Sequence, residues 1–203
     1  MRWRDQTAVV VASGPSLTLD DLNVVERHAP RPRVIVVNES WRAFPAADVL
    51  YGADPEWWYH RAPRLDKFNG ERWSQDTRWG NVRMPGVSRM KLTHGLGVAE
   101  RGGDTIYSGG NSAYQAMQLA IVWGARRIVF LGLDLKEHDG KRHWHADHVQ
   151  PLRNTATETL KYFADCFART APALAIAGVQ VFNASRTTAL KAFPCMSIQD
   201  ALR

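Results

Sequence analysis

Apolar and polar residues follow one another in blocks along this chain, and the blocks have the lengths of strands and helices. Short, mainly apolar runs, typical of strands covered on both faces, span 7–12, 34–37, 49–53 and 128–131, and a last strand is predicted at 179–183. Apolar residues at helical spacing occupy 17–29, 113–121 and 155–177. We expect Pro172 to break the last of these helices. A short helix at 197–202, with Ser197 as its N-cap, completes the pattern.

The alternation of strands and helices predicts one domain over 1–203. Its expected fold is a Rossmann-like, doubly wound α/β sheet, mostly parallel, with helices on both faces. Residues 55–103 differ in character, because tryptophans and arginines are interleaved there. We expect this segment to be a peripheral insertion or acceptor flap, with a further strand at 84–92 and a glycine-rich loop at 93–103. Its aromatic side chains suit stacking on bases or sugars, and they equally suit packing the flap.

Small polar residues follow the C-terminal ends of the predicted strands. Ser13, Asn38 and Asp54 follow the first three strands, and Asp134 follows the strand at 128–131. In a parallel sheet these ends lie along one edge, where open α/β proteins bind their ligands. A carboxylate at that edge is expected to face solvent or ligand, so neutralising Asp134 is expected to lower turnover more than stability.

Two glycine turns are candidates for phosphate binding. They are Ser13-Gly14-Pro15-Ser16 and Ser108-Gly109-Gly110-Asn111-Ser112. Backbone N–H groups beside a helix N-terminus suit an anion, although a plain strand-to-helix turn explains the first segment equally simply. Neither turn matches a Walker loop or the GxGxxG fingerprint. We expect Gly109 to leave room for a phosphate, so that Gly109→Val blocks nucleotide binding and leaves the fold intact.

Composition narrows the class of partner. The 203 residues carry a net charge of +6, which favours an anionic partner such as a nucleotide, a nucleic acid or an acidic glycan. No stretch reaches the apolar length of a membrane span, and no apolar segment of a signal peptide follows MRWRDQ. A cytoplasmic location without membrane contact is therefore expected. Cys166 and Cys195 are expected to be free thiols.

The loop after the strand at 128–131 is rich in histidine. His143, His145, Asp147 and His148 match the HxHxDH pattern of metallo-β-lactamase-type hydrolases, whose alternating histidines bind zinc. That fold needs further histidine ligands downstream, and no histidine follows His148. We therefore favour one or more of these imidazoles as an acid, a base or a phosphate contact. A solvated loop without chemistry is the other alternative.

Five segments together resemble one superfamily. They are VVVASGPSL, VIVVNESW, YGADPEWW, IYSGGNSAYQAMQLAIVWGARRIVFLGLDL and VFNASRTTALKAFPCMSIQDAL. The superfamily comprises the family 42 bacterial sialyltransferases, the motility accessory factor glycosyltransferases and 6-hydroxymethylpterin diphosphokinase-like proteins, and it has small phage-encoded members. The resemblance covers most of the chain and is poorest over 55–103.

The resemblance implies roles for the matching residues. In the sialyltransferases the GPS and SG turns hold the donor's phosphate and ribose, and an asparagine after the second strand reads the nucleotide. The nucleotide-binding residues that it implies here are Ser13, Gly14, Pro15, Ser16, Asn38, Asp54, Ser108, Gly109, Gly110 and Asn111. Asp54 stands where those enzymes carry another asparagine, which leaves the base open. Their catalytic histidine lies in the loop after the GIDF segment, so the implied catalytic candidates are Asp134, His143, His145 and His148.

Three functions are consistent with these features. The first, which we favour, is a glycosyltransferase that uses a nucleotide-activated donor and an unknown acceptor. The second is a pyrophosphokinase or nucleotidyltransferase of the diphosphokinase-like type. Such proteins use ATP and magnesium, which would give Asp54 and Asp134 a metal role. The third is a non-catalytic module that binds nucleotides or nucleic acid.

Overall fold

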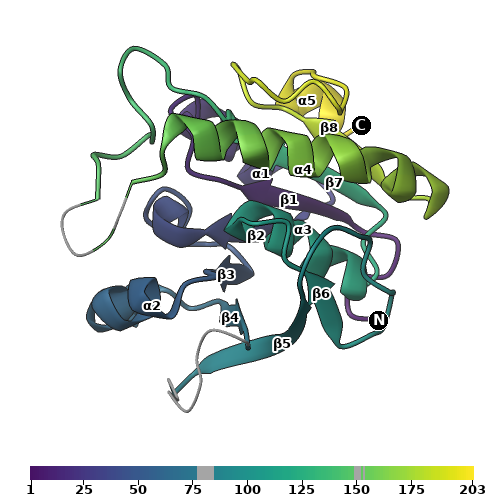
Figure 1. Cartoon of the computed structure of the whole chain (residues 1–203), viewed down its shortest axis with the longest axis horizontal. Helices are drawn as coiled ribbons and strands as arrows, with labels where there is room; N and C mark the ends of the chain where they lie inside the picture. Colours follow the sequence, from purple (N-terminus) through teal and green to yellow (C-terminus); the bar gives the residue numbers. More distant parts are fainter. Residues whose placement is uncertain (77–84, 149–151, 153) are drawn as a thin grey trace.

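Eight parallel strands form one sheet, in the order β6-β5-β4-β3-β2-β1-β7-β8 (Figure 1). The structure is a computed structural model that describes residues 1–76, 85–148, 152 and 154–203. The strands are β1 Thr7–Val11, β2 Arg33–Val37, β3 Val49–Tyr51, β4 Glu71–Gln75, β5 Val87–Thr93, β6 Thr105–Tyr107, β7 Arg127–Leu131 and β8 Gln180–Asn183. The helices are α1 Leu19–Arg27, α2 Pro55–Arg61, α3 Ser112–Val122, α4 Thr157–Ile176 and α5 Ile198–Ala201. Two 3₁₀ turns are η1 Asn38–Arg42 and η2 Ala62–Lys67.

The chain enters the sheet near its centre and changes direction once. From β1 it steps outward through β2 to β6, and α3 then carries it back to β7 on the other side of β1. Val11 of β1 lies level with Val36 of β2 and with Leu131 of β7. The carboxyl ends of β1 and β7 therefore flank the switch point, where doubly wound sheets bind their ligands.

Helices cover both faces of the sheet, because the central strands are apolar on both sides. Val10 and Phe130 belong to a core shared with α3 and α4, which includes Phe167. Val9 and Val11 belong to a second core, shared with α1, α2 and α5. Figure 1 shows α4 along the top of the view and α2 at the lower left. The predicted doubly wound α/β fold is confirmed.

Residues 55–103 contribute to the sheet itself, which corrects their description as an insertion. They supply β4 and β5, which pair in turn beyond β3. Trp57 and Trp58 of α2 are both buried in the core. Residues 77–84, which include Arg78 and Trp79, lie outside the described residues. The use of this segment as an acceptor flap stays a prediction.

The prediction that Pro172 breaks the last long helix is wrong, because α4 continues through it to Ile176. A proline removes one backbone hydrogen bond from a helix and crowds the preceding turn. Here Phe167 and Leu174, on either side of the proline, are both buried in the same core. Burial of both halves of the helix therefore offsets the local loss.

The other expectations concern single residues and composition. Ser197 caps α5 as predicted, since its side chain accepts from the N–H of Asp200. Cys166 and Cys195 are free thiols. Among the described residues, no helix combines the length and the apolar composition needed to cross a membrane.

Candidate functional site

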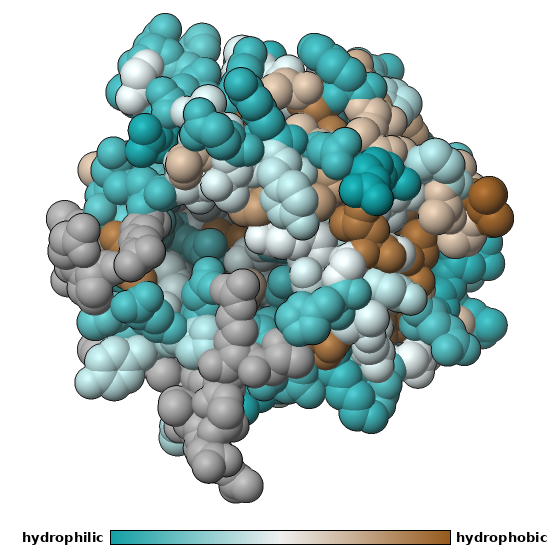
Figure 2. All heavy atoms as spheres, in the orientation of Figure 1, coloured by the Kyte–Doolittle hydropathy of each residue, from teal (hydrophilic) through white to brown (hydrophobic). Residues whose placement is uncertain are grey.

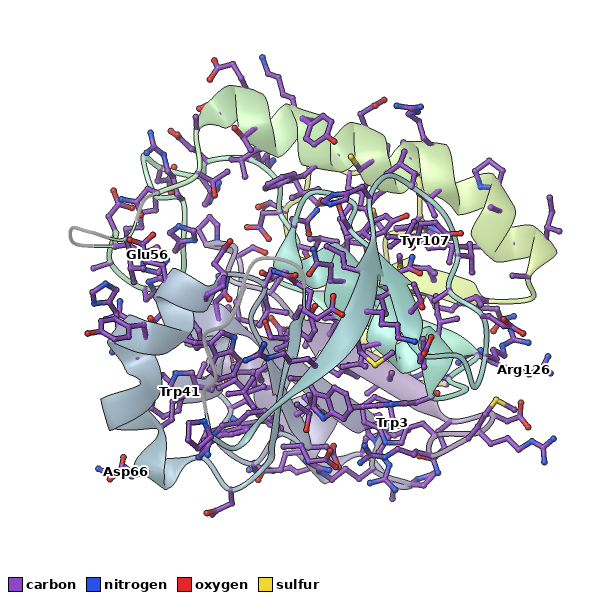
Figure 3. The ribbon with its side chains drawn as sticks, turned by 60° about the horizontal axis from the view of Figure 1, so that its bottom comes forward. Trp3, Trp41, Glu56, Asp66, Tyr107 and Arg126 are labelled. Carbon is purple, nitrogen blue, oxygen red and sulfur yellow. The ribbon has the colours of Figure 1, made fainter. Side chains whose placement is uncertain are left out.

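A cavity of about 420 Å³ lies at the carboxyl ends of the central strands. Its volume is in the range of small-molecule sites. Figure 2 shows the recess on the left of the view, between the loop that follows β7 and α2. Glu56 of α2 lines this cavity, and Arg126, next to the amino end of β7, lies on the opposite side of the molecule (Figure 3).

Most of the residues selected from the sequence line this cavity. Those that line it are Ser13, Gly14, Asn38, Asp54, Ser108, Gly110, Asn111, Asp134, His143 and His148. Pro15, Ser16, Gly109 and His145 are not part of its wall. The four strand ends that were expected to share one edge therefore do meet around one cavity, whereas parts of both glycine turns are turned inward.

The turn from Ser13 to Ser16 uses its backbone donors within the protein. The N–H of Gly14 donates to the carbonyl of Gly132 at 2.7 Å, and the N–H of Ser16 donates to Asp134 Oδ2 at 2.7 Å. Pro15 has no N–H to offer. A Cβ on Gly14 would lie 2.4 Å from the Gly132 oxygen, so glycine permits this close approach. These two N–H groups fasten the turn to the end of β7. The role of the turn toward a nucleotide stays a prediction, since Ser13 and Gly14 line the cavity.

Asp134 is the residue after β7 that accepts the bond from the Ser16 N–H. Its side chain also accepts from the Ser16 hydroxyl at 2.6 Å, and the residue is only 1% exposed. Burial raises the pKa of this carboxyl above its ordinary value, and the two bonds from Ser16 oppose that rise. The expectation that Asp134 faces solvent is therefore wrong, and both of its oxygens accept bonds from the neighbouring turn. Its role toward a ligand in the cavity that it lines stays a prediction.

Gly109 is also needed for the fold. Its φ of +50° lies in the left-handed region, and an added Cβ would lie 2.1 Å from Cγ of Tyr114. Tyr114 is fully buried, so its ring has little room to move. The expectation that Gly109→Val leaves the fold intact is therefore contradicted. The space that this glycine preserves is occupied by the Tyr114 ring rather than left for a phosphate.

The N-terminus of α3 does face the cavity. Asn111 caps the helix, because its Oδ1 accepts from the N–H of Tyr114 at 2.8 Å. Ser112 and Ala113 follow it in the first turn and line the cavity, and within the described ranges neither backbone N–H has an acceptor. Free N–H groups at the positive end of an eleven-residue helix form a site that suits an anion.

The histidine loop lies across the same cavity. His143 and His145 stack with their ring centroids 4.9 Å apart, and His148 lies 5.3 Å from His143 and 5.2 Å from His145. His143 and His148 line the cavity, while Nδ1 of His145 lies 2.6 Å from the carbonyl oxygen of Ala146. Nε2 of His143 and Nε2 of His145 are buried, and neither has a partner among the described residues.

Burial disfavours the charged form of all three imidazoles. Burial, followed by the mutual repulsion of the neighbouring rings, lowers the pKa of His143 to about 4. Burial also lowers the pKa of His145, against the opposing effects of the Ala146 carbonyl and Glu39. The pKa of His148 is lowered by burial and then by His145. A neutral imidazole is a proton acceptor, and a phosphate placed beside it would favour its protonated form.

Sequence reasoning missed several residues of the cavity wall. Lys136 and Arg142 line it from the histidine loop, and Gln75 lines it from β4. The lysine and the arginine were visible as charges in the polar stretch after Asp134. The contribution of β4 was hidden, because its sequence has no apolar run.

The magnesium role that the resemblance implies for Asp54 and Asp134 stays a prediction. Each carboxylate oxygen of Asp134 accepts one bond from Ser16. In the part of the chain that is described, no group of three or more His, Cys, Asp or Glu is arranged to hold a metal ion.

Comparisons with known proteins support the fold. No protein-family model matches this sequence, and no curated protein sequence matches it. The structure is similar to that of the MAf glycosyltransferase from Magnetospirillum magneticum AMB-1, with a TM-score of 0.63 and 17% sequence identity. The match covers 97% of this chain and 34% of that protein. This chain therefore shares its fold with a part of that glycosyltransferase, and this part makes up about one third of its length.

Proposed function

We propose that this chain is a glycosyltransferase that takes a sugar from a nucleotide-activated donor. The proposal is supported chiefly by one observation. The two acceptor-free N–H groups of the α3 N-terminus share a cavity with the positive charges of Lys136 and Arg142. Such a wall suits the phosphate of a donor, and the similarity in fold to a glycosyltransferase is consistent with it.

The same cavity has the chemistry to hold the hydroxylated part of the donor. Asp54 and Glu56 contribute carboxylates to its wall, and Asn38 at the end of β2 contributes an amide. Asn38 has a φ of +49°, and its Oδ1 is buried without a partner among the described residues. Carboxylate and amide oxygens accept hydrogen bonds from sugar or base groups. The ribose, sugar or base is assigned to these three side chains and the phosphate to the N-terminus of α3.

Transfer then needs a base and a stabilised leaving group. The acceptor hydroxyl attacks the anomeric carbon, and the bond from that carbon to the donor phosphate oxygen breaks. The hydroxyl proton passes to the neutral imidazole of His143 or His148, and the bonding electrons stay on the phosphate oxygen. The α3 N–H groups, Lys136 and Arg142 then stabilise the charge of the released nucleotide.

Calorimetric titration of the protein with CMP, CDP, UDP, GDP and ATP, each with and without magnesium, tests the proposal. We expect at least one nucleotide to bind without magnesium. Binding of ATP alone, and only with magnesium, would instead favour a diphosphokinase-like enzyme. Binding of single-stranded DNA with no binding of any nucleotide would favour a nucleic-acid module.

The catalytic assignment is tested with sugars linked to the nucleotide that binds. Replacing the imidazole that acts as the base by alanine is expected to lower the transfer rate by roughly 10²–10⁴. The matched control is His28→Ala, which removes an imidazole that does not line the cavity. If His143→Ala and His148→Ala both retain the parent rate, neither residue is the base. Stoichiometric zinc in the purified protein would replace this mechanism with a metal-dependent one.

A further inference from the structure

Trp144 lies between the two stacked histidines in the sequence, and its indole meets the His145 ring edge to face, with the ring centroids 5.2 Å apart. Its backbone N–H donates to the carbonyl of Ser13 at 3.1 Å, and its indole Nε1–H donates to Ser40 Oγ at 3.3 Å. Its ring packs at the edge of the core that contains α1, α2 and α5. Trp144 is therefore held by the β1 turn through its backbone and by η1 through its indole, two segments that are distant from it in the sequence.

The two acceptors of Trp144 are themselves connected. Ser40 Oγ donates to the carbonyl of Ala12 at 3.0 Å and lies 3.2 Å from Ser13 Oγ. Ser13 Oγ in turn lies 3.4 Å from the carbonyl oxygen of Val37. Ser40 is fully buried, so this small network has a fixed position between the ends of β1 and β2.

The rest of the histidine loop is tied to other elements. Arg142 donates to Glu137 at 2.8 Å, and Thr157 at the start of α4 donates to the same carboxylate at 3.2 Å. The N–H of His148 donates to Asn154 at 2.8 Å. These contacts hold the two ends of the loop. Between residues 142 and 148, Trp144 and His143 both contact the sheet edge, since the His143 imidazole also hydrogen-bonds the backbone of Ser13.

We propose that Trp144 is the positioning residue that holds His143 and His145 as a stacked pair beside the Ser13 turn. The His143 ring stacks on the His145 ring, and the His145 ring meets the indole. Because the backbone and the indole of Trp144 are both bonded to the sheet edge, the position of Trp144 sets the position of the stacked pair. This inference rests on the proposed function for its catalytic meaning, but the position of the imidazoles is measurable without any substrate.

The test compares Trp144→Phe with a matched control. Phenylalanine keeps the aromatic packing and the backbone N–H but loses the indole donor. The control is Trp41→Phe in η1, because Trp41 Nε1 has no partner among the described residues. Trp41 lies on the same side of the molecule as Glu56 (Figure 3). A second variant, Ser40→Ala, removes the acceptor of the same bond and keeps Trp144.

The first readout is the NMR titration of the His143 and His145 rings in the ligand-free protein. The charged groups that face the cluster are Glu39, Arg42, Arg61 and Asp147, with His148 as the third ring. In the parent, burial lowers the pKa of both imidazoles. We expect Trp144→Phe and Ser40→Ala to raise both midpoints toward 6.5 as the pair leaves its buried position, and Trp41→Phe to leave them at the parent values. A merely structural Trp144 would lower the unfolding temperature without moving the midpoints, and that result would overturn the proposal.

The second readout is turnover with the nucleotide sugar that the parent uses. For Trp144→Phe we expect kcat to fall by roughly 10–100-fold with KM changed less than about threefold, because a misplaced base slows chemistry more than binding. An equal loss in Trp41→Phe would overturn the proposal. If the parent has no transferase activity, the proposed function fails, and the NMR comparison still decides whether Trp144 positions the histidines.

Discussion

Asp134 shows that an acid at a strand end of an open sheet can belong to the fold. Its two oxygens accept bonds from the backbone and the hydroxyl of Ser16, which closes the β1 turn onto the end of β7. Gly14 completes this closure, because any side chain would collide with the Gly132 carbonyl. At the scale of single residues, the sequence features of a ligand site and those of a tight strand junction are the same. Their hydrogen-bond partners distinguish them.

We expect Asp134→Ala to lower the free energy of unfolding by about 2–3 kcal/mol, since it leaves the buried Ser16 N–H without an acceptor. Asp134→Asn is expected to cost much less. Its carbonyl oxygen can accept from the Ser16 N–H while its amide donates to the Ser16 hydroxyl, which is free to turn. Urea denaturation of both variants is the measurement. Equal losses for the two variants would show that the charge, rather than the bond to the Ser16 N–H, is what stabilises the turn.

Gly109 and Gly140 form a matched pair for testing steric fit. Both have positive φ, +50° and +71°, but an added Cβ collides with Tyr114 only at Gly109. At Gly140 it meets nothing within 4 Å. We expect Gly140→Ala to cost about 1–2 kcal/mol from backbone strain alone. Gly109→Ala is expected to lower the stability by more than Gly140→Ala does. Circular dichroism melting curves should show a lower melting temperature for Gly109→Ala. Similar melting temperatures for the two variants would contradict the tight packing of Tyr114.

At the scale of elements, the N-terminus of α3 is where stability and binding can be separated. Asn111→Asp keeps a good N-cap, and its charge favours the helix dipole, so the melting temperature is expected to hold or to rise. The same charge repels an anionic ligand. We expect the affinity for the bound nucleotide to fall by about tenfold or more in calorimetry. Asn111→Ser is the control, because it keeps a cap without adding charge. Unchanged affinity in Asn111→Asp would place the phosphate elsewhere.

The elements that the sequence revealed are those buried on both faces. β1, β2 and β7 are apolar runs because α3 and α4 cover one side of them and α1, α2 and α5 cover the other. β4 was missed because it lies toward an edge, where Glu71 is exposed and Arg72 and Trp73 are half-buried. β6 has only three residues, too few for a periodic signal. An apolar run in the sequence indicates a strand that is buried on both faces. Strands near an edge of the sheet, with both exposed and buried residues, therefore lack the apolar run by which a strand is predicted.

The site was predictable to a similar extent and for a related reason. Parallel strands bring their C-terminal ends together, so Ser13, Asn38 and Asp54 were expected to meet, and all three line the cavity. Side-chain direction was not predictable. It depends on partners distant in sequence, such as the pairing of Ser16 with Asp134 or the collision that Tyr114 imposes on Gly109. Their roles toward a nucleotide remain predictions.

At the scale of the whole molecule, the histidine cluster links stability to pH. A pKa of about 4 for His143 in the folded protein, against 6.5 as the ordinary value, means that the unfolded chain binds more protons between these limits. The lowered pKa values of His145 and His148 act in the same direction. The contribution of the cluster is therefore fully present above about pH 6.5. It is lost progressively as the pH falls toward 4.

We expect the free energy of unfolding of the parent to fall between pH 7 and pH 5 by more than that of His143→Gln. One pKa unit corresponds to about 1.4 kcal/mol, and solvent screening of a partly exposed group reduces this. The difference between the two proteins is expected to be roughly 1 kcal/mol, or about 2–4 °C in Tm. His94→Gln, which removes an imidazole outside the cluster, should follow the parent. If His143→Gln loses as much stability on acidification as the parent does, the burial of His143 does not govern its protonation. A bound phosphate has the opposite effect on the pKa of the neighbouring imidazoles, because it favours their protonated form. A saturating nucleotide bound at the N-terminus of α3 is therefore expected to weaken the dependence of the free energy of unfolding on pH.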